Sequence, residues 1–165
     1  IAISTDFLTS VHSRRYITDA GHAAFDNALA KGTGFAVAVV DVDHFKHIND
    51  RFGHAVGDDV LKAIALAMRA TCRDSDTLGR YGGEEFAVLL AGILPEHALV
   101  AAERLRNAVA AIEIRVGEDT IAPTASVGVA CLTADDRDFD HVLVRADRAL
   151  YRAKEEGRNR VVLAE

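Results

Sequence analysis

Acidic side chains stand at the ends of two strand-like segments, and this placement suits a metal ion. The stretch "RYGGEEFAVLL" carries Glu84 and Glu85 between two segments typical of strands, and "FAVAVVDVD" ends in Asp41 and Asp43. Alternate side chains of a strand face the same side. Mg²⁺ takes one or two protein carboxylates together with waters and substrate phosphates. If hairpin and strand end meet at one rim, Asp41 and Glu84 share a divalent cation.

The residues after this strand are of types that hold a purine nucleotide. Lys46 lies in an expected loop, where an ammonium and backbone N–H groups can bind phosphate. Asn49 and Asp58 can pair with the Watson–Crick edge of guanine. Taken singly, Lys46 is more typical of an exposed surface lysine, Asn49 and Asp58 are typical of a turn and a helix cap, and a lone D-x-D is more typical of solvated loop acids. We expect Asp43 to be a structural residue of its turn.

Two glycines precede the glutamates of the hairpin. We expect Gly82 and Gly83 to adopt positive φ in a tight turn and to let a nucleotide approach the backbone closely. The glutamates then stand at the hairpin tip. The pattern as a whole predicts a purine nucleotide beside a metal-bearing hairpin.

Hydrophobic periodicity predicts which elements position these groups. Helical spacing and strand-like runs alternate along the chain, but one strand pair is a direct hairpin. A doubly wound parallel sheet lacks such a hairpin, so we predict an α+β fold with a mostly antiparallel sheet flanked by helices. The expected helices cover 14–31, 54–72, 95–112 and 139–156, and the expected strands cover 35–43, 77–81, 86–90, 124–132 and 160–164.

Composition narrows the class of protein. The chain has 165 residues and a formal charge of −6, which argues against a general nucleic-acid binder. No apolar run approaches the roughly 20 residues of a spanning helix, and Cys72 and Cys131 form no C-x-x-C pair, so we expect reduced cysteines and a cytoplasmic location. Because the chain opens at "IAISTDF", we expect residues 1–165 to be one domain excised from a longer regulatory protein.

Four motifs in order resemble the GGDEF family, the diguanylate cyclases. "RYGGEEF" matches the name-giving motif in its glutamate variant, and "DVDHFKHINDRFGHAVGDDVL" is similar to the family's first block. "ASVGVA" and "RADRALYRAKEEGRNRV" match the later blocks. The resemblance runs from about Asp6 to Val162 and implies the palm-like α+β fold of class III nucleotidyl cyclases.

The resemblance also implies an activity, a cofactor and a set of site residues. Two GTP molecules would condense into cyclic di-GMP with release of two pyrophosphates, in a transient homodimer, since each domain holds one GTP. The cation would be Mg²⁺, with Mn²⁺ as an alternative. By motif position, the metal ligands are Asp41, Glu84 and the carbonyl of Val42, the substrate-binding residues are Phe45, Asn49, His54, Asp58, Lys154 and Arg158, and the catalytic residues are Lys46, Glu84 and Glu85.

A second site is implied upstream of the hairpin. "RDSD" has the R-x-x-D form at the family's spacing before "GGEEF", and an arginine fork with a carboxylate suits guanine. The resemblance implies that Arg73, Asp76 and Arg104 bind cyclic di-GMP as an inhibitor. R-x-x-D alone is a weak pattern, and an exposed charged turn is the alternative, but its offset from "GGEEF" favours the site.

The opening block departs from the family, which has approximately DxLTGLxNRR where this chain has "DFLTSVHSRR". Ser10 replaces a glycine and Ser13 an asparagine in a turn that we expect to couple the domain to an upstream sensor. This change keeps open a catalytically weak domain that binds GTP or cyclic di-GMP as a receptor. Another cyclase or polymerase-like activity on the same palm is the more distant alternative.

Overall fold

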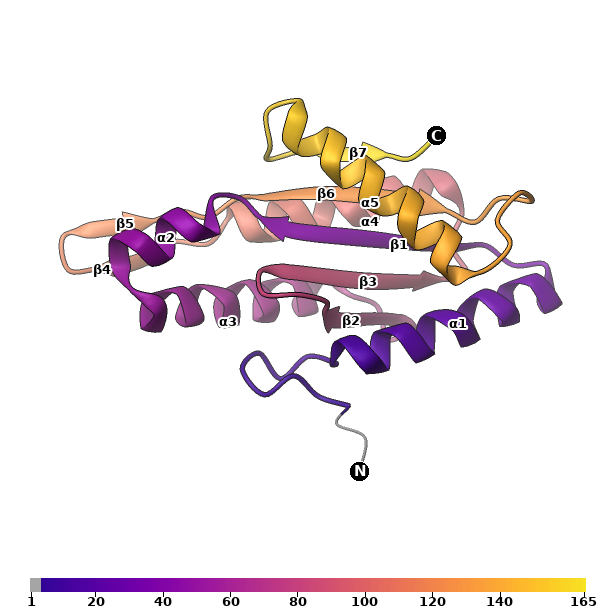
Figure 1. The fold of residues 1–165 in the computed structure, drawn as a ribbon, viewed down its shortest axis with the longest axis horizontal. Coiled ribbons are helices and arrows are strands. Elements are labelled where there is room, and N and C mark those ends of the chain that lie inside the picture. The colour runs from indigo at the N-terminus through magenta and orange to yellow at the C-terminus, as the bar shows by residue number, and fades with distance from the viewer. Residues whose placement is uncertain (1–3) are drawn as a thin grey trace.

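The computed structural model describes residues 4–165 and builds them around one central sheet (Figure 1). In chain order the elements are α1 (Arg14–Lys31), β1 (Phe35–Val42), α2 (Phe45–Phe52), α3 (His54–Thr71), β2 (Asp76–Arg80), β3 (Glu85–Ala91), α4 (Pro95–Ala110), β4 (Ile114–Val116), β5 (Asp119–Ile121), β6 (Ala125–Cys131), α5 (Phe139–Glu155) and β7 (Val161–Leu163). None of the helices in this part of the chain is long and apolar enough to cross a membrane.

The sheet has the strand order β2-β3-β1-β6-β7, with β1 at its centre. The pairs β2–β3, β3–β1 and β1–β6 are antiparallel, and only the edge strand β7 is parallel to its neighbour β6. The expected α+β fold with a mostly antiparallel sheet is therefore confirmed. The register pairs Asp41 of β1 with Glu85 of β3 on one side and with Ser126 of β6 on the other.

The central strand is apolar along its length because both faces of the sheet are covered. Ala38 and Val40 belong to the core formed with α3 and α4, and Val37 and Val39 belong to the core formed with α1 and α5. Figure 1 shows α5 and α1 on the near face of the sheet and α3 and α4 on the far face. By strand alternation Asp41 lies on the α5 face.

A short helix, α2, occupies the segment that the sequence analysis treats as a loop. Phe45 and Ile48 are 8% exposed each and recur with Phe52 at helical spacing, which is the pattern of one buried helical face. Gly53, at φ 92°, separates α2 from α3. The expectation that Lys46 lies in a loop is wrong, because it is the second residue of this helix.

A small hairpin, β4–β5, extends beyond the sheet and was not expected from the sequence. Its turn contains Gly117 at φ 62°, a left-handed conformation that glycine adopts without strain. Arg51 at the end of α2 donates to Asp119 of β5 at 3.1 Å, so this hairpin contacts α2.

Gly128 of β6 is required by the close approach of α5. A Cβ at this position would lie 2.2 Å from the carbonyl oxygen of Ala146 and 2.2 Å from the amide nitrogen of Leu150. Both are helix backbone atoms that cannot turn away. We predict that Gly128→Ala lowers the free energy of unfolding by about 3 kcal/mol, measured by urea denaturation.

Gly83→Ala is the matched control, because an added Cβ there meets no atom within 4 Å. It is expected to change stability by less than about 0.5 kcal/mol. Equal stability of the Gly128 variant and the wild type would contradict the packing of α5 on β6.

Candidate active site

One cavity collects six of the residues that the sequence singled out. It has a volume of about 570 Å³ and lies among α2, the start of α3 and the β2–β3 turn. This volume is in the range of small-molecule sites. The predicted residues in its lining are Phe45, Lys46, Asn49, His54, Asp58 and Glu84, and the other lining residues are Asp50, Leu61, Arg80 and Gly83.

Asn49 presents an incomplete polar group in this cavity. Its Oδ1 atom is buried and has no hydrogen-bond partner within residues 4–165. The missing side chain of Gly57 makes room for it, since a Cβ there would lie 1.8 Å from the Asn49 Oδ1. A buried acceptor without a partner is costly, and a donor on a ligand would complete it.

Lys46 is a highly exposed charge of the cavity, with 90% of its side chain accessible. Its Nζ atom donates to Asp50 at 3.1 Å, one turn along α2. Such an exposed pair contributes little to stability, so the ammonium can exchange this partner for a ligand anion. His44, which precedes the helix, makes no capping bond with its side chain. The first N–H groups of α2 therefore keep their capacity to bind an anion.

Three carboxylates lie where β1 meets the hairpin. The N–H of Val42 donates to the carbonyl of Glu84 at 3.1 Å, so Glu84 sits directly beside the end of β1. Asp41 is 7% exposed, and its Oδ2 accepts from Lys154 Nζ at 2.6 Å. Burial raises the pKa of Glu85, and repulsion from Asp41, Asp147 and Glu84 raises it further against the opposing effect of Lys154.

This donor set fits the cation that the sequence suggests. Within residues 4–165, no group of three or more histidine, cysteine, aspartate or glutamate side chains is arranged to bind a metal on its own. Mg²⁺ does not need such a cage, because it is commonly held by one or two carboxylates with waters and substrate phosphates. Asp41, Glu84 and the backbone carbonyl of Val42 lie on adjacent chain segments and form a donor set of this open type.

Asp43 has the structural role expected of it. It is 5% exposed, and its carboxylate accepts from Thr124 Oγ1 at 2.8 Å, Ser126 Oγ at 2.6 Å and the N–H of Asn159 at 3.0 Å. These bonds fix the end of β1 to β6 and to the turn after α5. The expectation for Asp43 is confirmed.

The hairpin tip is held by Arg80, which the sequence analysis did not single out. The Arg80 Nη2 donates to the carbonyl of Gly83 at 2.7 Å and its Nε to the carbonyls of Gly82 and Gly83 at 3.2 and 3.1 Å. Its Nη1 lies 3.4 Å from the Asp6 Oδ2. These contacts could not be predicted from the sequence, because an arginine at the end of a strand that bonds backbone carbonyls forms no recognisable motif.

The expectation of positive φ at Gly82 and Gly83 is wrong. The described glycines with positive φ are Gly32, Gly53, Gly92, Gly117 and Gly157. The turn spans residues 81–84 and closes through the Tyr81 N–H to the Glu85 carbonyl at 2.7 Å, so it is not a two-residue turn that demands left-handed residues. Space remains open over Gly83.

The N-terminal turn is held by hydrogen bonds to Asp6 and leads into a capped helix. Thr9 donates to the Asp6 Oδ2 through its N–H at 2.9 Å and its hydroxyl at 2.6 Å. Ser10 adopts φ 64° where the family has glycine, a strained conformation for a residue with a Cβ. Ser13 caps α1 by accepting from the Tyr16 N–H at 3.2 Å.

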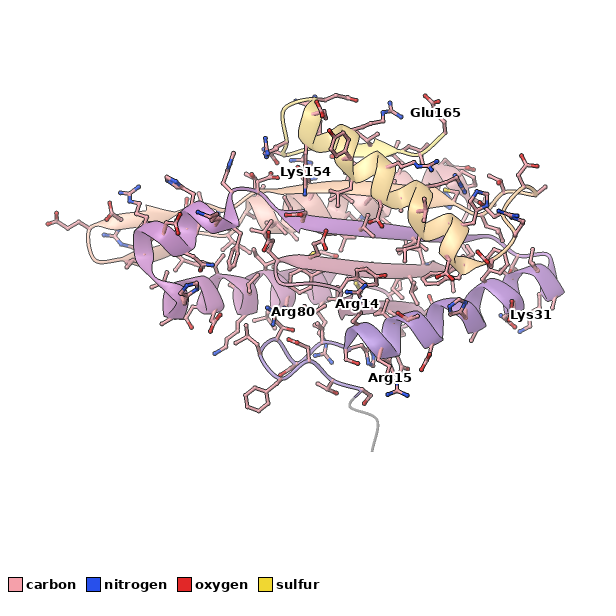
Figure 2. The ribbon with its side chains drawn as sticks, in the orientation of Figure 1. Arg14, Arg15, Lys31, Arg80, Lys154 and Glu165 are labelled. Atoms are coloured by element: carbon pink, nitrogen blue, oxygen red, sulfur yellow. The ribbon has the colours of Figure 1, made fainter. Side chains whose placement is uncertain are left out.

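Lys154 and Arg158 lie outside the cavity lining. Lys154 reaches from the last turn of α5 to Asp41 (Figure 2). Arg158 is exposed in the following turn at φ 61°. The structure thus brings Lys154 to the acids beside the hairpin and leaves the Arg158 side chain in solvent.

A second cavity collects the three residues of the expected inhibitory site. It measures about 250 Å³ and is lined by Arg73, Asp76 and Arg104 together with Thr71, Gly92, Ile93, His97, Val100 and Ala101. The Arg73 Nη2 donates to the Asp76 Oδ1 at 2.7 Å and to the carbonyl of Ala91 at 3.1 Å. Arg104 is exposed on α4 and lines the same cavity.

Comparison with known proteins identifies the family. Residues 3–160 match the family described as "Diguanylate cyclase, GGDEF domain". Because this match covers nearly all of the chain, the protein belongs to the GGDEF family. The response regulator PleD of Caulobacter vibrioides is 39% identical over 160 residues, which are 96% of this chain and 35% of PleD.

Solved structures agree with this assignment. The GGDEF domain of DgcB from Caulobacter crescentus, in complex with c-di-GMP, has a TM-score of 0.94 at 32% identity and covers 99% of this chain and 96% of that one. The active GGEEF domain of a diguanylate cyclase from Vibrio cholerae has a TM-score of 0.88 at 35% identity, covering 93% and 97%. The chain spans less than half the length of the curated relatives it matches.

The Asp6–Arg80 contact makes a pH-dependent contribution to stability. Burial alone would raise the pKa of Asp6, but hydrogen bonds from Thr9 and the charge of Arg80 outweigh it, so the pKa lies below its ordinary value. A lowered pKa stabilises the fold above the unfolded value of about 3.9 and this contribution is lost as the pH falls through the folded value. We predict that Asp6→Asn lowers the free energy of unfolding by about 1–2 kcal/mol at pH 7 and by much less at pH 3.

Urea denaturation of the variant at both pH values measures this effect. Asp26→Asn, on the exposed side of α1, is the control and is expected to match the wild type within about 0.5 kcal/mol. An Asp6 variant that loses the same stability at pH 3 as at pH 7 would show that the carboxylate charge is not what holds the turn.

Proposed function

We propose that residues 1–165 are the catalytic domain of a diguanylate cyclase that belongs to a longer protein with an upstream regulatory domain. Two GTP molecules condense into cyclic di-GMP, and two pyrophosphates leave. The observation that carries the proposal is the cavity in which Phe45, Asn49 and Asp58 meet Glu84 of the hairpin. The c-di-GMP bound to the DgcB relative and the activity named for the Vibrio cholerae domain support the same ligand chemistry.

The guanosine occupies the cavity between α2 and α3. The amide of Asn49, whose Oδ1 is buried against Gly57 without a partner, turns toward the cavity and accepts from guanine, and Asp58 accepts from the remaining donors of the base or from the ribose. His54 lines the same region, and Phe45 forms its apolar floor. Open space over Gly83 lets the nucleotide lie against the hairpin backbone.

The triphosphate extends toward the cations. Lys46 and the first N–H groups of α2 bind phosphate oxygens, as helix N-termini do in other proteins. Lys154 and Arg158, on the far side of Asp41, offset the charge that develops on the leaving pyrophosphate. Lys46, with most of its side chain in solvent, can turn to this group without losing a strong bond.

Each bond-forming step joins the 3′-oxygen of one GTP to the α-phosphorus of the other. The bond from that phosphorus to pyrophosphate breaks, and the proton of the 3′-hydroxyl passes to Glu84, with Glu85 as the second candidate. Asp41, the carbonyl of Val42 and Glu84 would hold Mg²⁺ or Mn²⁺. When bound, this cation neutralises phosphate charge and lowers the pKa of the attacking hydroxyl.

Two domains must face each other for the ring to close. One cavity of this size holds one GTP, and each nucleotide supplies both an attacking oxygen and a phosphorus under attack. The protein therefore works as a transient homodimer, and most of the catalytic gain comes from alignment and charge neutralisation.

Glu84 is the residue whose loss tests the proposal. We predict that Glu84→Gln lowers the rate of cyclic di-GMP formation by about 100-fold or more, because a carboxylate at the reacting atoms is removed. Cyclic di-GMP is measured by chromatography after incubation with GTP and Mg²⁺ over a range of protein concentrations. The rate of the wild type is expected to rise as the square of the protein concentration when dimers are scarce.

Glu118→Gln is the control, since Glu118 lies in the exposed β4–β5 turn. Undiminished product from the Glu84 variant would refute the assigned site. A wild type that binds GTP without forming product at any concentration would favour a receptor in place of an enzyme.

Arg73, Asp76 and Arg104 form the inhibitory product site in this proposal. Guanine offers O6 and N7 to an arginine fork and its N1 and N2 donors to a carboxylate. We predict that Arg104→Ala and Arg73→Ala relieve inhibition of GTP turnover by added cyclic di-GMP and leave uninhibited turnover within about twofold of the wild type.

Loss of the Arg73 side chain could also affect folding, because Arg73 bonds Asp76 and the carbonyl of Ala91. Arg104 has no ion pair in the described part of the chain, so its variant tests ligand binding without this effect. Arg115→Ala, on the exposed side of β4, is the control. Inhibition of equal strength in all four proteins would place the inhibitory ligand elsewhere.

A further inference from the structure

A third cavity also contains the R-x-x-D pair in its lining, but not Arg104. It has a volume of about 420 Å³, and its lining includes Arg73 and Asp76 as well as His12, Arg69 and Asp74. The cavity with Arg104 also contains Arg73 and Asp76, so the two spaces meet at this pair. Arg69 lies outside the motifs quoted above, and Asp74 occupies a variable position of R-x-x-D.

The Arg73–Asp76 pair is already bonded, whereas the other charges in the adjoining cavity are not. Arg73 and Asp76 bond each other twice, through the Arg73 Nη2 and Nε to the Asp76 Oδ1 at 2.7 and 3.1 Å, and the Arg73 N–H donates to the Asp76 Oδ2 at 2.8 Å. The side chains of Arg69 and Asp74 are exposed and make no hydrogen bond or ion pair within residues 4–165. The adjoining cavity therefore holds one uncommitted guanidinium and one uncommitted carboxylate.

An uncommitted arginine and carboxylate in one cavity suit a guanine. The guanidinium fork can donate to O6 and N7, and the carboxylate can accept from N1–H and the N2 amino group. Adenine offers neither O6 nor a donor at N1, so the same pair discriminates against it. The His12 ring, stacked on Tyr16 with centroids 3.9 Å apart, adds an aromatic wall to the cavity.

We propose that Arg69 and Asp74 recognise a guanine of cyclic di-GMP, so that the product site has two chambers that meet at Arg73. Cyclic di-GMP carries two identical bases on one ring, and two chambers around a shared arginine match that symmetry. The inference rests on the proposed product site and adds to it the residues that hold a base on the side of the N-terminal turn.

Calorimetric titration with cyclic di-GMP tests this assignment. Arg69→Gln and Asp74→Asn are each expected to raise the dissociation constant about tenfold or more, with GTP turnover at low product unchanged. Titration with cyclic di-AMP separates base recognition from simple charge attraction. Asp74→Asn should narrow the preference for cyclic di-GMP over cyclic di-AMP, whereas an effect of charge alone would strengthen the binding of both anionic ligands equally, because the variant removes a negative charge.

Lys62→Gln is the matched control, because Lys62 is an exposed cation on the same helix that does not line this cavity. Unchanged binding by the Arg69 and Asp74 variants, while Arg73→Ala loses it, would overturn the second chamber and leave the inhibitory site of the proposed function intact. A wild type that binds no cyclic di-GMP would overturn both, and cyclase activity would still be decided by the Glu84 variant.

Discussion

The register between β1 and β3 is the constraint on which the acidic site depends. It sets Asp41 opposite Glu85 and brings the carbonyl of Glu84 to the N–H of Val42. A slip of one residue would move every side chain of β1 to the opposite face of the sheet, so Asp41 would enter the core of α3 and α4. The alternation of Val37 and Val39 with Ala38 and Val40 between two cores fixes the register. The hydrophobic core thereby decides where the carboxylates lie.

The charges around this junction hold one another in place. Lys154 neutralises Asp41, which would otherwise be a nearly buried and unpaired carboxylate. Arg80 holds the carbonyls of the glycine turn and contacts Asp6, so the N-terminal turn and the hairpin tip are joined by one side chain. Strand β2 carries Arg80 at one end and Asp76 at the other. The two cavities with expected ligands thus lie along the same short hairpin.

Much of this arrangement could be predicted from the sequence, and the exceptions have physical causes. Helix α1 has the predicted bounds because its apolar spacing, Ser13 and Gly32 agree. Helix α2 was missed because two turns give too few periodic positions, although Phe45 and Ile48 carried the pattern. Lys46 was consequently assigned to a loop. The φ values at Gly82 and Gly83 depend on the number of residues in the turn. That number depends on where the two strands end, which the sequence does not define closely enough. Arg80 was missed because its partners are backbone carbonyls and a distant aspartate, which leave no spacing in the sequence.

In the proposed mechanism, two separate chain segments bring carboxylates to one cation beside a guanosine cavity. A crystal structure with Mn²⁺ and a non-hydrolysable GTP analogue tests it directly, since the anomalous signal of manganese locates the ion. The account predicts an anomalous peak bound by Asp41 and Glu84, with the guanine against Asn49 and Asp58. A peak that neither carboxylate contacts, or a guanine bound outside this cavity, would contradict it.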